Sequence, residues 1–350
     1  MEQTQSLHRS AATLLIGLVG LLAGGAAGRA DGAPPGATGT VRTEEVELRN
    51  GETPLAGVVL VPATEEPVPG VVLIHGSGES DRTQTWASAF ARGLAERGIA
   101  VLLPDKRGSG ASGGDWKTAS FEVLADDALA GVEALQGVDG VDGRRVGVLG
   151  LSQGGHIAPL AARRSSEVAF VVDVSGSAVP ISEQVIDEVE KLARRQGFTP
   201  EQVERVNALH RLGIRYGLTG EGWEEYEAAL TAALESGLAG HGVVEPFPRD
   251  RDHWVWAWAR AVGDYDPLPH WKALDVPALV LYGGEDTQIH VPESVDLLLE
   301  ATAEASLDLT LTVFGDAGHG LSYRRGHEYG IRPEVLGVIA AWIREAESVR

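Results

Sequence analysis

Cysteine is absent from this chain of 350 residues, and lysine is scarce. Without cysteine the chain can form no disulfide and offers no thiol for lipid attachment. The chain has only four lysines but 25 arginines. This bias fits either a GC-rich genome or a salt-adapted surface, because salt screens the repulsion among many surface charges. An exported chain of this kind must be stabilised by its hydrophobic core alone.

Positive charge is also in short supply. The formal net charge is −21, and the isoelectric point is about 4.8. Such a charge repels the phosphates of nucleic acids and of anionic membranes, so neither is expected as a partner. Apolar residues make up 43% of the chain, which is enough for a large core and too much for a disordered protein.

The N-terminus has the pattern of a secretion signal. Arg9 supplies a short positive region, residues 11–23 are mostly apolar, and the small residues of GGAAGRADG follow. This order predicts a signal peptide over residues 1–30, cleaved after Ala27 or Ala30. The apolar run is short and rich in glycine, so a retained membrane anchor is the alternative. We expect a secreted or periplasmic protein with no stable membrane association after cleavage.

Residues 31–40, DGAPPGATGT, are predicted to be a linker, because they are small, rich in proline and glycine, and without periodicity. Beyond them, stretches typical of strands alternate with stretches at helical spacing up to about residue 179. The alternation resumes after residue 268 and ends in a helix from Pro333 to about Ala346. In all, eight strands are expected. Strands separated by helices predict a mostly parallel sheet with helices on both faces.

The region between the two halves of this pattern contains no convincing strand. It carries four helical signals, among them TPEQ at Thr199–Gln202, which has an N-cap, a first-turn proline and a capping glutamine. We therefore assign residues 41–179 and 269–350 to an α/β core. Residues 180–268 are predicted to be a helical cap inserted into that core.

The stretch VGVLGLSQGGHIAPL contains Gly150-Leu151-Ser152-Gln153-Gly154, which fits the pattern G-x-S-x-G. A strand pattern precedes it, and a helical pattern follows. This context is typical of a nucleophile elbow, a sharp turn at which glycines avoid collisions and the serine is exposed at the carboxyl edge of the sheet. We predict that Ser152 is a nucleophile. A tight turn with an incidental serine is the alternative.

A serine nucleophile needs a base, and the base needs an acid to orient it. In this kind of sheet the three follow in the order serine, acid, histidine, each at the carboxyl end of a strand. Asp286 in YGGEDTQI and His319 in GDAGHGL satisfy both conditions and are the predicted acid and base. Glu285 and Asp173 are rival acids, and His327 is the rival base.

Attack on a carbonyl creates an oxyanion, which needs hydrogen-bond donors already in place. The backbone N–H of Gln153, directly after the nucleophile, is one predicted donor. The second is assigned to the backbone N–H of Ser77, in the glycine-rich loop HGSGES after a buried strand. A plain tight turn is the alternative for that loop.

Two further motifs are less specific. DKRGSGASGGDW does not have the spacing of a phosphate-binding loop, so Asp105 and Arg107 are expected either to brace loops through ion pairs or to be exposed loop charges. In HWVWAWAR, helical spacing places Trp254 and Trp258 on one face of a helix and turns Trp256 away from that face. That face is expected to pack on the core or to line a substrate pocket. No pattern of metal ligands occurs in the sequence.

With these motifs the chain resembles the α/β-hydrolase fold superfamily. LIHGSGESDR, PDKRGSGASGG, GLSQGG, DYDPLPHW, GGEDTQI and GDAGHGL are similar to motifs of bacterial serine hydrolases related to the prolyl oligopeptidase and dienelactone hydrolase groups. Many of these are esterases with a helical cap. The resemblance implies Ser152 as nucleophile, Asp286 as acid and His319 as base. The large N-terminal propeller of prolyl oligopeptidases is lacking, which favours small esters over peptides.

We therefore expect a secreted serine hydrolase that cleaves carboxylic esters through a covalent acyl-enzyme. His319 would take the proton of Ser152, protonate the leaving alcohol and later activate water. The expected partner is a small-molecule ester, and the chemistry requires no cofactor and no metal. The alternatives are a peptidase or amidase acting on short peptides and a non-catalytic binding protein on the same scaffold. The sequence leaves open the acyl and alcohol preference and the oligomeric state.

Overall fold

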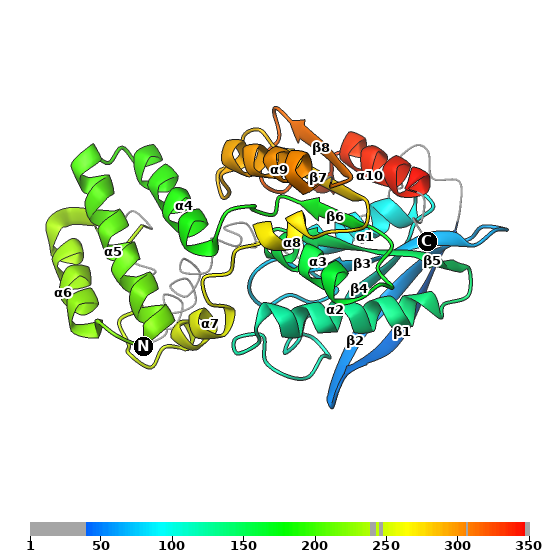
Figure 1. The fold of residues 1–350 in the computed structure, drawn as a ribbon, viewed down its shortest axis with the longest axis horizontal. Coiled ribbons are helices and arrows are strands. Elements are labelled where there is room, and N and C mark those ends of the chain that lie inside the picture. Colours follow the sequence, from blue (N-terminus) through cyan, green and yellow to red (C-terminus); the bar gives the residue numbers. More distant parts are fainter. Residues whose placement is uncertain (1–39, 239–242, 245–247, 306, 347–350) are drawn as a thin grey trace.

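The computed structural model describes residues 40–238, 243–244, 248–305 and 307–346, and its centre is an eight-stranded sheet (Figure 1). The predicted signal peptide and all but the last residue of the predicted linker lie outside these ranges. The strands of the sheet are β1 (Val41–Asn50), β2 (Thr53–Pro62), β3 (Val68–Ile74), β4 (Ala100–Pro104), β5 (Val141–Leu151), β6 (Val171–Val174), β7 (Ala278–Gly283) and β8 (Leu309–Phe314).

The sheet is mixed but mostly parallel. Its strand order is β1-β2-β4-β3-β5-β6-β7-β8, and β2 runs antiparallel to both β1 and β4, whereas the other neighbours are parallel. The β1–β2 hairpin turns at Gly51-Glu52, where Gly51 has a φ of 57° that glycine adopts without strain. The predicted eight-stranded, mostly parallel sheet is confirmed.

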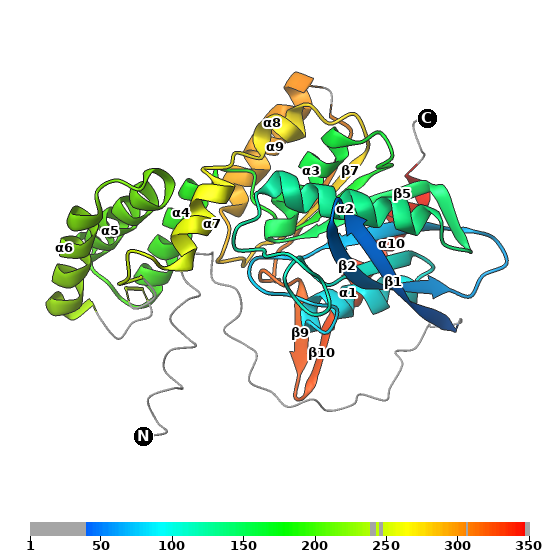
Figure 2. The same ribbon diagram turned by 90° about the horizontal axis from the view of Figure 1, so that it is seen from below.

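Helices cover both faces of this sheet. They are α1 (Thr85–Ala95), α2 (Phe121–Gln136), α3 (Gln153–Arg164), α8 (Leu268–Lys272), α9 (Val291–Ala305) and α10 (Pro333–Glu345). Helices α1 and α10 lie on one face, and α2, α3, α8 and α9 lie on the other (Figure 2). In the described part of the chain, no helix is both long and apolar enough to cross a membrane.

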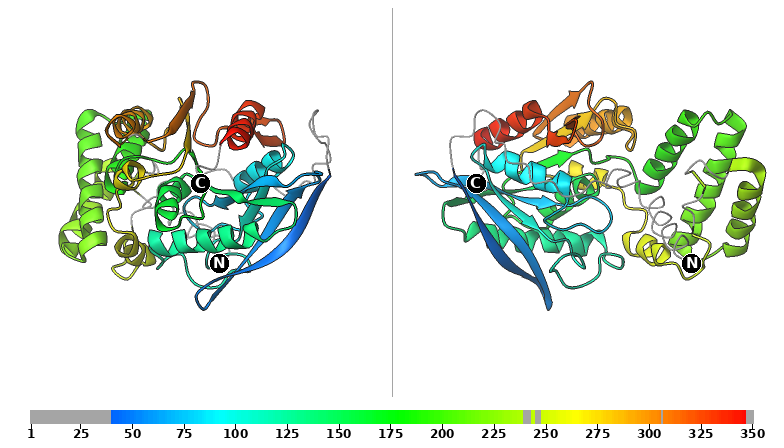
Figure 3. Two further views of the ribbon diagram at one scale, coloured as in Figure 1. Left: turned by 45° about the vertical axis from the view of Figure 1, so that its right-hand side comes forward. Right: turned by 180° about the vertical axis from the view of Figure 1, so that it is seen from behind.

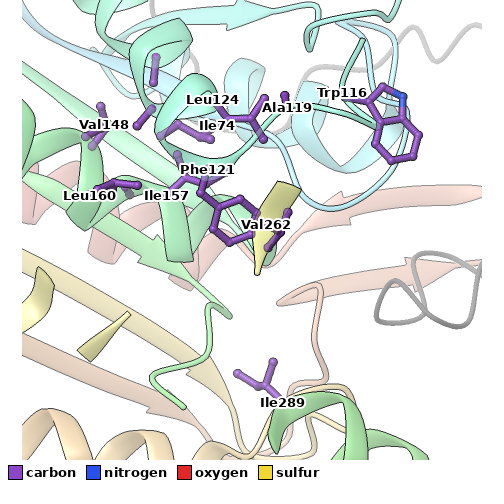
Figure 4. Close-up of a cluster of buried hydrophobic side chains, with 14 of the residues drawn as sticks. Ile74, Trp116, Ala119, Phe121, Leu124, Val148, Ile157, Leu160, Val262 and Ile289 are labelled. Carbon is purple, nitrogen blue, oxygen red and sulfur yellow. The ribbon is translucent and has the colours of Figure 1, made fainter. Parts of the chain in front are cut away.

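A hydrophobic layer lies on each face of the sheet. The central strands are buried on both sides and send alternate side chains into the two layers. In β3, Val72 and Ile74 belong to the layer under α2 and α3, whereas Val71 and Leu73 belong to the layer under α1 and α10. Figure 4 shows part of the first layer, including Ile74. The continuous apolar run that predicts a buried parallel strand reflects this double burial.

Between β6 and β7 the chain leaves the sheet and forms a helical region beside it, which we call the cap (Figures 1 and 3). Its elements are α4 (Ile181–Arg195), α5 (Pro200–Thr219), α6 (Trp223–Ala233), a π-helical segment (Leu234–Leu238) and α7 (Trp254–Val262). Helix α5 begins with a capping box, in which the Thr199 side chain accepts the Gln202 N–H and the Gln202 side chain accepts the Thr199 N–H. The boundaries of the cap at residues 180 and 268 stay a prediction.

The tryptophans of α7 face two different parts of the protein. Trp256 is buried inside the cap, with its ring 5.0 Å from the ring of Tyr216. Trp254 packs against Trp116 of the core, with ring centroids 5.2 Å apart. Trp254 and Trp256 therefore lie on different faces of α7, as the helical spacing predicts. The face that carries Trp256 is turned away from the core and forms the centre of the cap.

A second, small sheet is not among the elements predicted from the sequence. Strands β9 (Ser322–Arg325) and β10 (Glu328–Ile331) form an antiparallel hairpin outside the main sheet, which projects from the core in Figure 2. Each strand has four residues and no apolar run. Such strands have no hydrophobic period that a sequence pattern could reveal.

Replacing Trp256 by alanine should destabilise the protein. The indole is fully buried, and its Nε1–H donates to the Asp250 carbonyl at 3.0 Å, so truncation leaves a cavity and an unpaired acceptor. We expect the free energy of unfolding to fall by about 3–5 kcal/mol, measured by urea unfolding followed by circular dichroism. Trp254→Ala, which removes a half-buried ring from the same helix, should cost clearly less. Equal costs would contradict the assignment of Trp256 to the centre of the cap.

Candidate active site

The predicted nucleophile lies in a strained turn between β5 and α3. Ser152 has a φ of 53° and a ψ of −115°, a conformation that residues with side chains rarely adopt. A Cβ atom on Gly150 would collide with the carbonyl of Gly154, and one on Gly154 would collide with the carbonyl of Ile74. These obstacles are backbone atoms in packed elements and cannot move aside. Packing therefore requires both glycines of G-x-S-x-G.

His319 and Asp286 meet at the same edge of the sheet. Asp286 follows β7, His319 follows β8, and the Nδ1 atom of His319 lies 2.8 Å from Oδ2 of Asp286. The Asp286 side chain is fully buried, and its Oδ1 accepts the backbone N–H groups of Gln288 at 2.8 Å and Ile289 at 3.3 Å. These bonds fix the carboxylate, which in turn orients the imidazole ring.

Neighbouring charges govern the ionisation of His319. Burial disfavours the charged imidazolium, but the carboxylate of Asp286 outweighs this effect and raises the pKa of His319 above its ordinary value. Glu188 of α4 and Asp173 of β6 act in the same direction. A histidine with such a pKa accepts a proton readily near neutral pH, as a general base must.

The rival acids and the rival base occupy other environments. Asp173 is buried at the end of β6, where it accepts the Gly176 N–H at 2.9 Å and where burial raises its pKa to about 7. Glu285 is exposed, and His327 is exposed in the turn between β9 and β10. Of the three candidate acids, it is Asp286 that the structure places in hydrogen-bond contact with His319.

Trp86 packs against the loop that carries His319. A Cβ atom on Gly76 would lie 3.6 Å from the Cβ of Ser152 and 3.9 Å from the Trp86 ring. The same ring packs against the imidazole of His319, with centroids 5.6 Å apart, and its Nε1–H donates to the Gly320 carbonyl at 2.8 Å. The indole ring of Trp86 therefore packs against the predicted base and lies near Gly76, which neighbours the turn of the predicted nucleophile.

A buried lysine joins the two segments that are predicted to supply the oxyanion donors. The Nζ atom of Lys106 donates to the Gly76 carbonyl and to the side-chain oxygen of Gln153, each at 2.9 Å. Gly76 directly precedes Ser77, which lines the same pocket as Ser152 and Gln153. Burial lowers the pKa of Lys106 to about 7. Its two bonds hold the loop after β3 against the start of α3.

Ion pairs brace the loop that follows β4. Asp105 binds the Arg82 guanidinium through two hydrogen bonds of 2.9 Å, and Arg107 pairs with Asp127 of α2. Asp105 and Arg107 are both buried. The expectation that these residues brace loops is confirmed, and the alternative of exposed loop charges is wrong.

A pocket lies between Ser152 and the cap. Core residues on its wall are Ser77, Phe121, Ser152, Gln153, His156 and Gln288, and cap residues are Ile181, Gln184, Val185, Glu188 and Trp258. Trp258 is therefore part of the wall of the pocket. Figure 4 shows Phe121 beside Val262 of α7, at the junction of core and cap. In the described ranges, no cluster of three or more histidine and carboxylate side chains is placed to hold a metal ion.

Two hydrogen bonds tie the cap to the site. The Nζ atom of Lys191 on α4 donates to the Ile289 carbonyl at 2.9 Å, and Ile289 also donates its N–H to Asp286. The hydroxyl of Tyr265, which follows α7, donates to the His156 carbonyl at 3.1 Å. The cap is therefore in contact both with the loop of the predicted acid and with the helix that follows the predicted nucleophile.

Lys106, Trp86 and Glu188 are not among the residues predicted from the sequence. Lys106 directly follows the strand pattern of β4, and this position at the sheet edge is the signal that points to it. Trp86 is far from His319 along the chain, and Glu188 is one of several acidic residues on α4. Only the packing of the fold brings Trp86 and Glu188 to the site.

Residues 71–329 match the sequence model of the alpha/beta hydrolase family. The chain belongs to this family. The predicted resemblance to α/β-hydrolases is confirmed, and the match extends from β3 to the β9–β10 hairpin, so it includes Ser152, Asp286 and His319.

Esterase EstD of Thermotoga maritima is 28% identical over 306 residues, which cover 83% of this chain and 65% of EstD. This chain therefore spans less than two thirds of the length of that relative. The structure of Pyrococcus furiosus esterase Pf2001 has a TM-score of 0.56 at 17% identity, covering 87% of this chain and 92% of that one. Pyrococcus horikoshii acylaminoacyl peptidase has a TM-score of 0.52 at 16% identity, covering 89% and 43%. Such low identities show a common fold alone.

The ammonium group of Lys106 should lose its proton near neutral pH. Burial disfavours its charge, and the expected pKa is about 7. Lysine side chains labelled with ¹³C and followed by NMR during a pH titration should therefore include one signal with a midpoint in this range. Lys106→Met assigns that signal by removing it. A Lys106 signal that does not titrate until strongly alkaline pH would contradict the burial argument.

Proposed function

We propose that this chain is an exported serine hydrolase that cleaves carboxylic esters through a covalent acyl-enzyme. The observation that carries the proposal is the 2.8 Å hydrogen bond between His319 and the buried Asp286, in a chain whose G-x-S-x-G serine lies in a strained turn at the carboxyl end of β5. A binding protein needs no base oriented by an acid, so this arrangement favours nucleophilic catalysis. Sequence similarity to esterase EstD supports an ester as the substrate.

In the first half of the reaction, His319 acts as the general base. Its Nε2 takes the proton of Ser152 as the serine oxygen attacks the ester carbonyl, while Asp286 holds the ring tautomer and stabilises the imidazolium. The backbone N–H groups of Gln153 and Ser77 donate to the oxyanion. The imidazolium then protonates the departing alcohol, which leaves the acyl group on the serine.

In the second half, water releases the acid. His319 takes a proton from water, the resulting hydroxide attacks the acyl carbon, and the serine oxygen leaves with the proton returned by the imidazolium. The pocket beneath the cap keeps part of the acyl group away from bulk water. The first 30 residues support export, because a positive region, an apolar stretch and small residues follow one another as in a signal peptide.

Ser152→Ala should abolish covalent labelling by a fluorophosphonate and lower kcat for p-nitrophenyl esters by roughly 10⁴-fold or more. The reason is that the alanine variant has no oxygen to form the acyl-enzyme. Labelling followed by intact-mass spectrometry measures the first effect, and Ser236→Ala, at an exposed serine of the cap, is the control that keeps both properties. A wild-type chain without an adduct would favour the binding-protein alternative. Cleavage of aminoacyl p-nitroanilides but of no ester would favour the peptidase.

Asp286→Asn should change the pH profile as well as the rate. His319 must be unprotonated to act, and its raised pKa makes kcat/KM fall as the pH drops through that value. Removing the carboxylate charge lowers the pKa of His319, so the acid limb should move to lower pH while kcat falls by roughly 10²–10⁴-fold. Glu285→Gln, at the exposed neighbouring acid, should leave the limb in place. An unmoved limb in Asp286→Asn would show that another group sets the profile.

A further inference from the structure

Lys106 binds the loop after β3 at two points, one on each side of Ser77. Its Nζ atom donates to the Gly76 carbonyl at 2.9 Å, and its backbone N–H donates to the Ser80 carbonyl at 3.0 Å. The N–H of Ser77 is the second predicted donor to the oxyanion. A single residue of the loop after β4 therefore holds the chain both before and after that donor.

The bond at Gly76 acts on the predicted donor directly. The carbonyl of Gly76 and the N–H of Ser77 belong to one peptide unit, and such a unit is planar. Every peptide bond in the described residues is trans, so the two groups point in opposite directions. A side chain that fixes the carbonyl on one side of the loop therefore fixes the direction of the N–H on the other side.

The loop itself offers little resistance to rotation of this peptide. Glycines flank Ser77 on both sides, and Gly78 has a φ of 81°, which glycine adopts without strain. Rotation of the peptide changes mainly the ψ of Gly76 and the φ of Ser77, and Gly76 has no Cβ atom to oppose it. The direction of the Ser77 N–H therefore depends on what the carbonyl of the same peptide binds.

The second bond of Nζ aligns this loop with the turn of the predicted nucleophile. Nζ donates to Oε1 of Gln153, whose backbone N–H is the other predicted donor, at 2.9 Å. An ammonium group has three N–H donors and a neutral amine has two, so either form of Lys106 can make both bonds. The side chain is buried, with Nζ 5.6 Å from the centre of the Trp116 ring. Packing thus holds the amine between the two segments.

Building on the proposed ester hydrolysis, we propose that Lys106 is a positioning residue, which orients the peptide that carries the Ser77 N–H toward the substrate oxyanion. Lys106 acts through the Gly76 carbonyl and the Gln153 side chain rather than on the substrate. The oxyanion exists in the tetrahedral transition state and not in the bound ester. The orientation therefore stabilises the transition state selectively, so it contributes to kcat and hardly to KM.

The experiment compares Lys106→Met with Lys117→Met on p-nitrophenyl esters. Methionine keeps an unbranched apolar stem but makes neither hydrogen bond. Lys117 is the matched control, because its Nζ lies 5.8 Å from the centre of the same Trp116 ring. Lys106→Met should lower kcat by roughly 10–10²-fold and change KM by about twofold at most. Lys117→Met should keep both constants.

A matched pair of ketones isolates the tetrahedral state. In an alkyl trifluoromethyl ketone, the Ser152 oxygen bonds to the carbonyl carbon, the carbonyl π electrons move to the oxygen as an oxyanion, and the serine proton passes to His319. The corresponding methyl ketone binds with its carbonyl intact. Lys106→Met should raise the Ki of the trifluoromethyl ketone by roughly the factor by which kcat/KM falls, and that of the methyl ketone by about twofold at most.

The outcomes separate this inference from the proposed function. An unchanged kcat in folded Lys106→Met, or equal weakening of both ketones, would overturn the positioning role and leave the proposed hydrolase intact. A wild-type chain with neither ester cleavage nor fluorophosphonate labelling of Ser152 would instead overturn the proposed function. Circular dichroism checks the fold of each variant. If Lys106→Met does not fold, Lys106→Gln, whose polar but shorter side chain cannot span both oxygens, should show the same selective loss.

Discussion

The left-handed backbone of Ser152 is the constraint on which the rest of the site depends. A conformation so unfavourable for serine persists only because the surrounding structure leaves no alternative. β5 is hydrogen-bonded to β3 on one side and to β6 on the other, and the Ser152 N–H itself donates to the Val174 carbonyl at 2.9 Å. The central position of the strand therefore supplies the rigidity that holds the hydroxyl at the edge of the sheet.

Parallel strands explain why residues so far apart in sequence can cooperate. The elbow follows β5, Asp286 follows β7 and His319 follows β8, so all three lie at carboxyl ends of strands that run in one direction. Lys106, which follows β4, adds an amine to the same edge. Because the fold brings one loop per strand to this edge, it can place a serine, a carboxylate, an imidazole and a lysine there without any local sequence relationship among them.

Much of this arrangement could be predicted because it depends on short, periodic patterns. Apolar runs predicted the central strands, and the glycines of G-x-S-x-G predicted the sharp turn at Ser152 between a strand and a helix. Asp286 was predicted as the residue paired with His319, and the structure shows this hydrogen bond. The β9–β10 hairpin could not be predicted, since its strands carry no hydrophobic period. Trp86 and Glu188 could not be predicted either, because their importance arises from tertiary neighbours that no local pattern encodes. Backbone periodicity therefore determines the features that could be predicted, and side-chain packing determines those that could not.

Ile289 uses both of its backbone groups at the junction of the cap and the core. Its N–H contributes to fixing the acid, and its carbonyl receives the ammonium of Lys191 from α4. One residue therefore bonds both the cap and the loop of Asp286. A substitution that shifts α4 at Lys191 acts on a backbone unit whose N–H is bonded to the carboxylate beside His319.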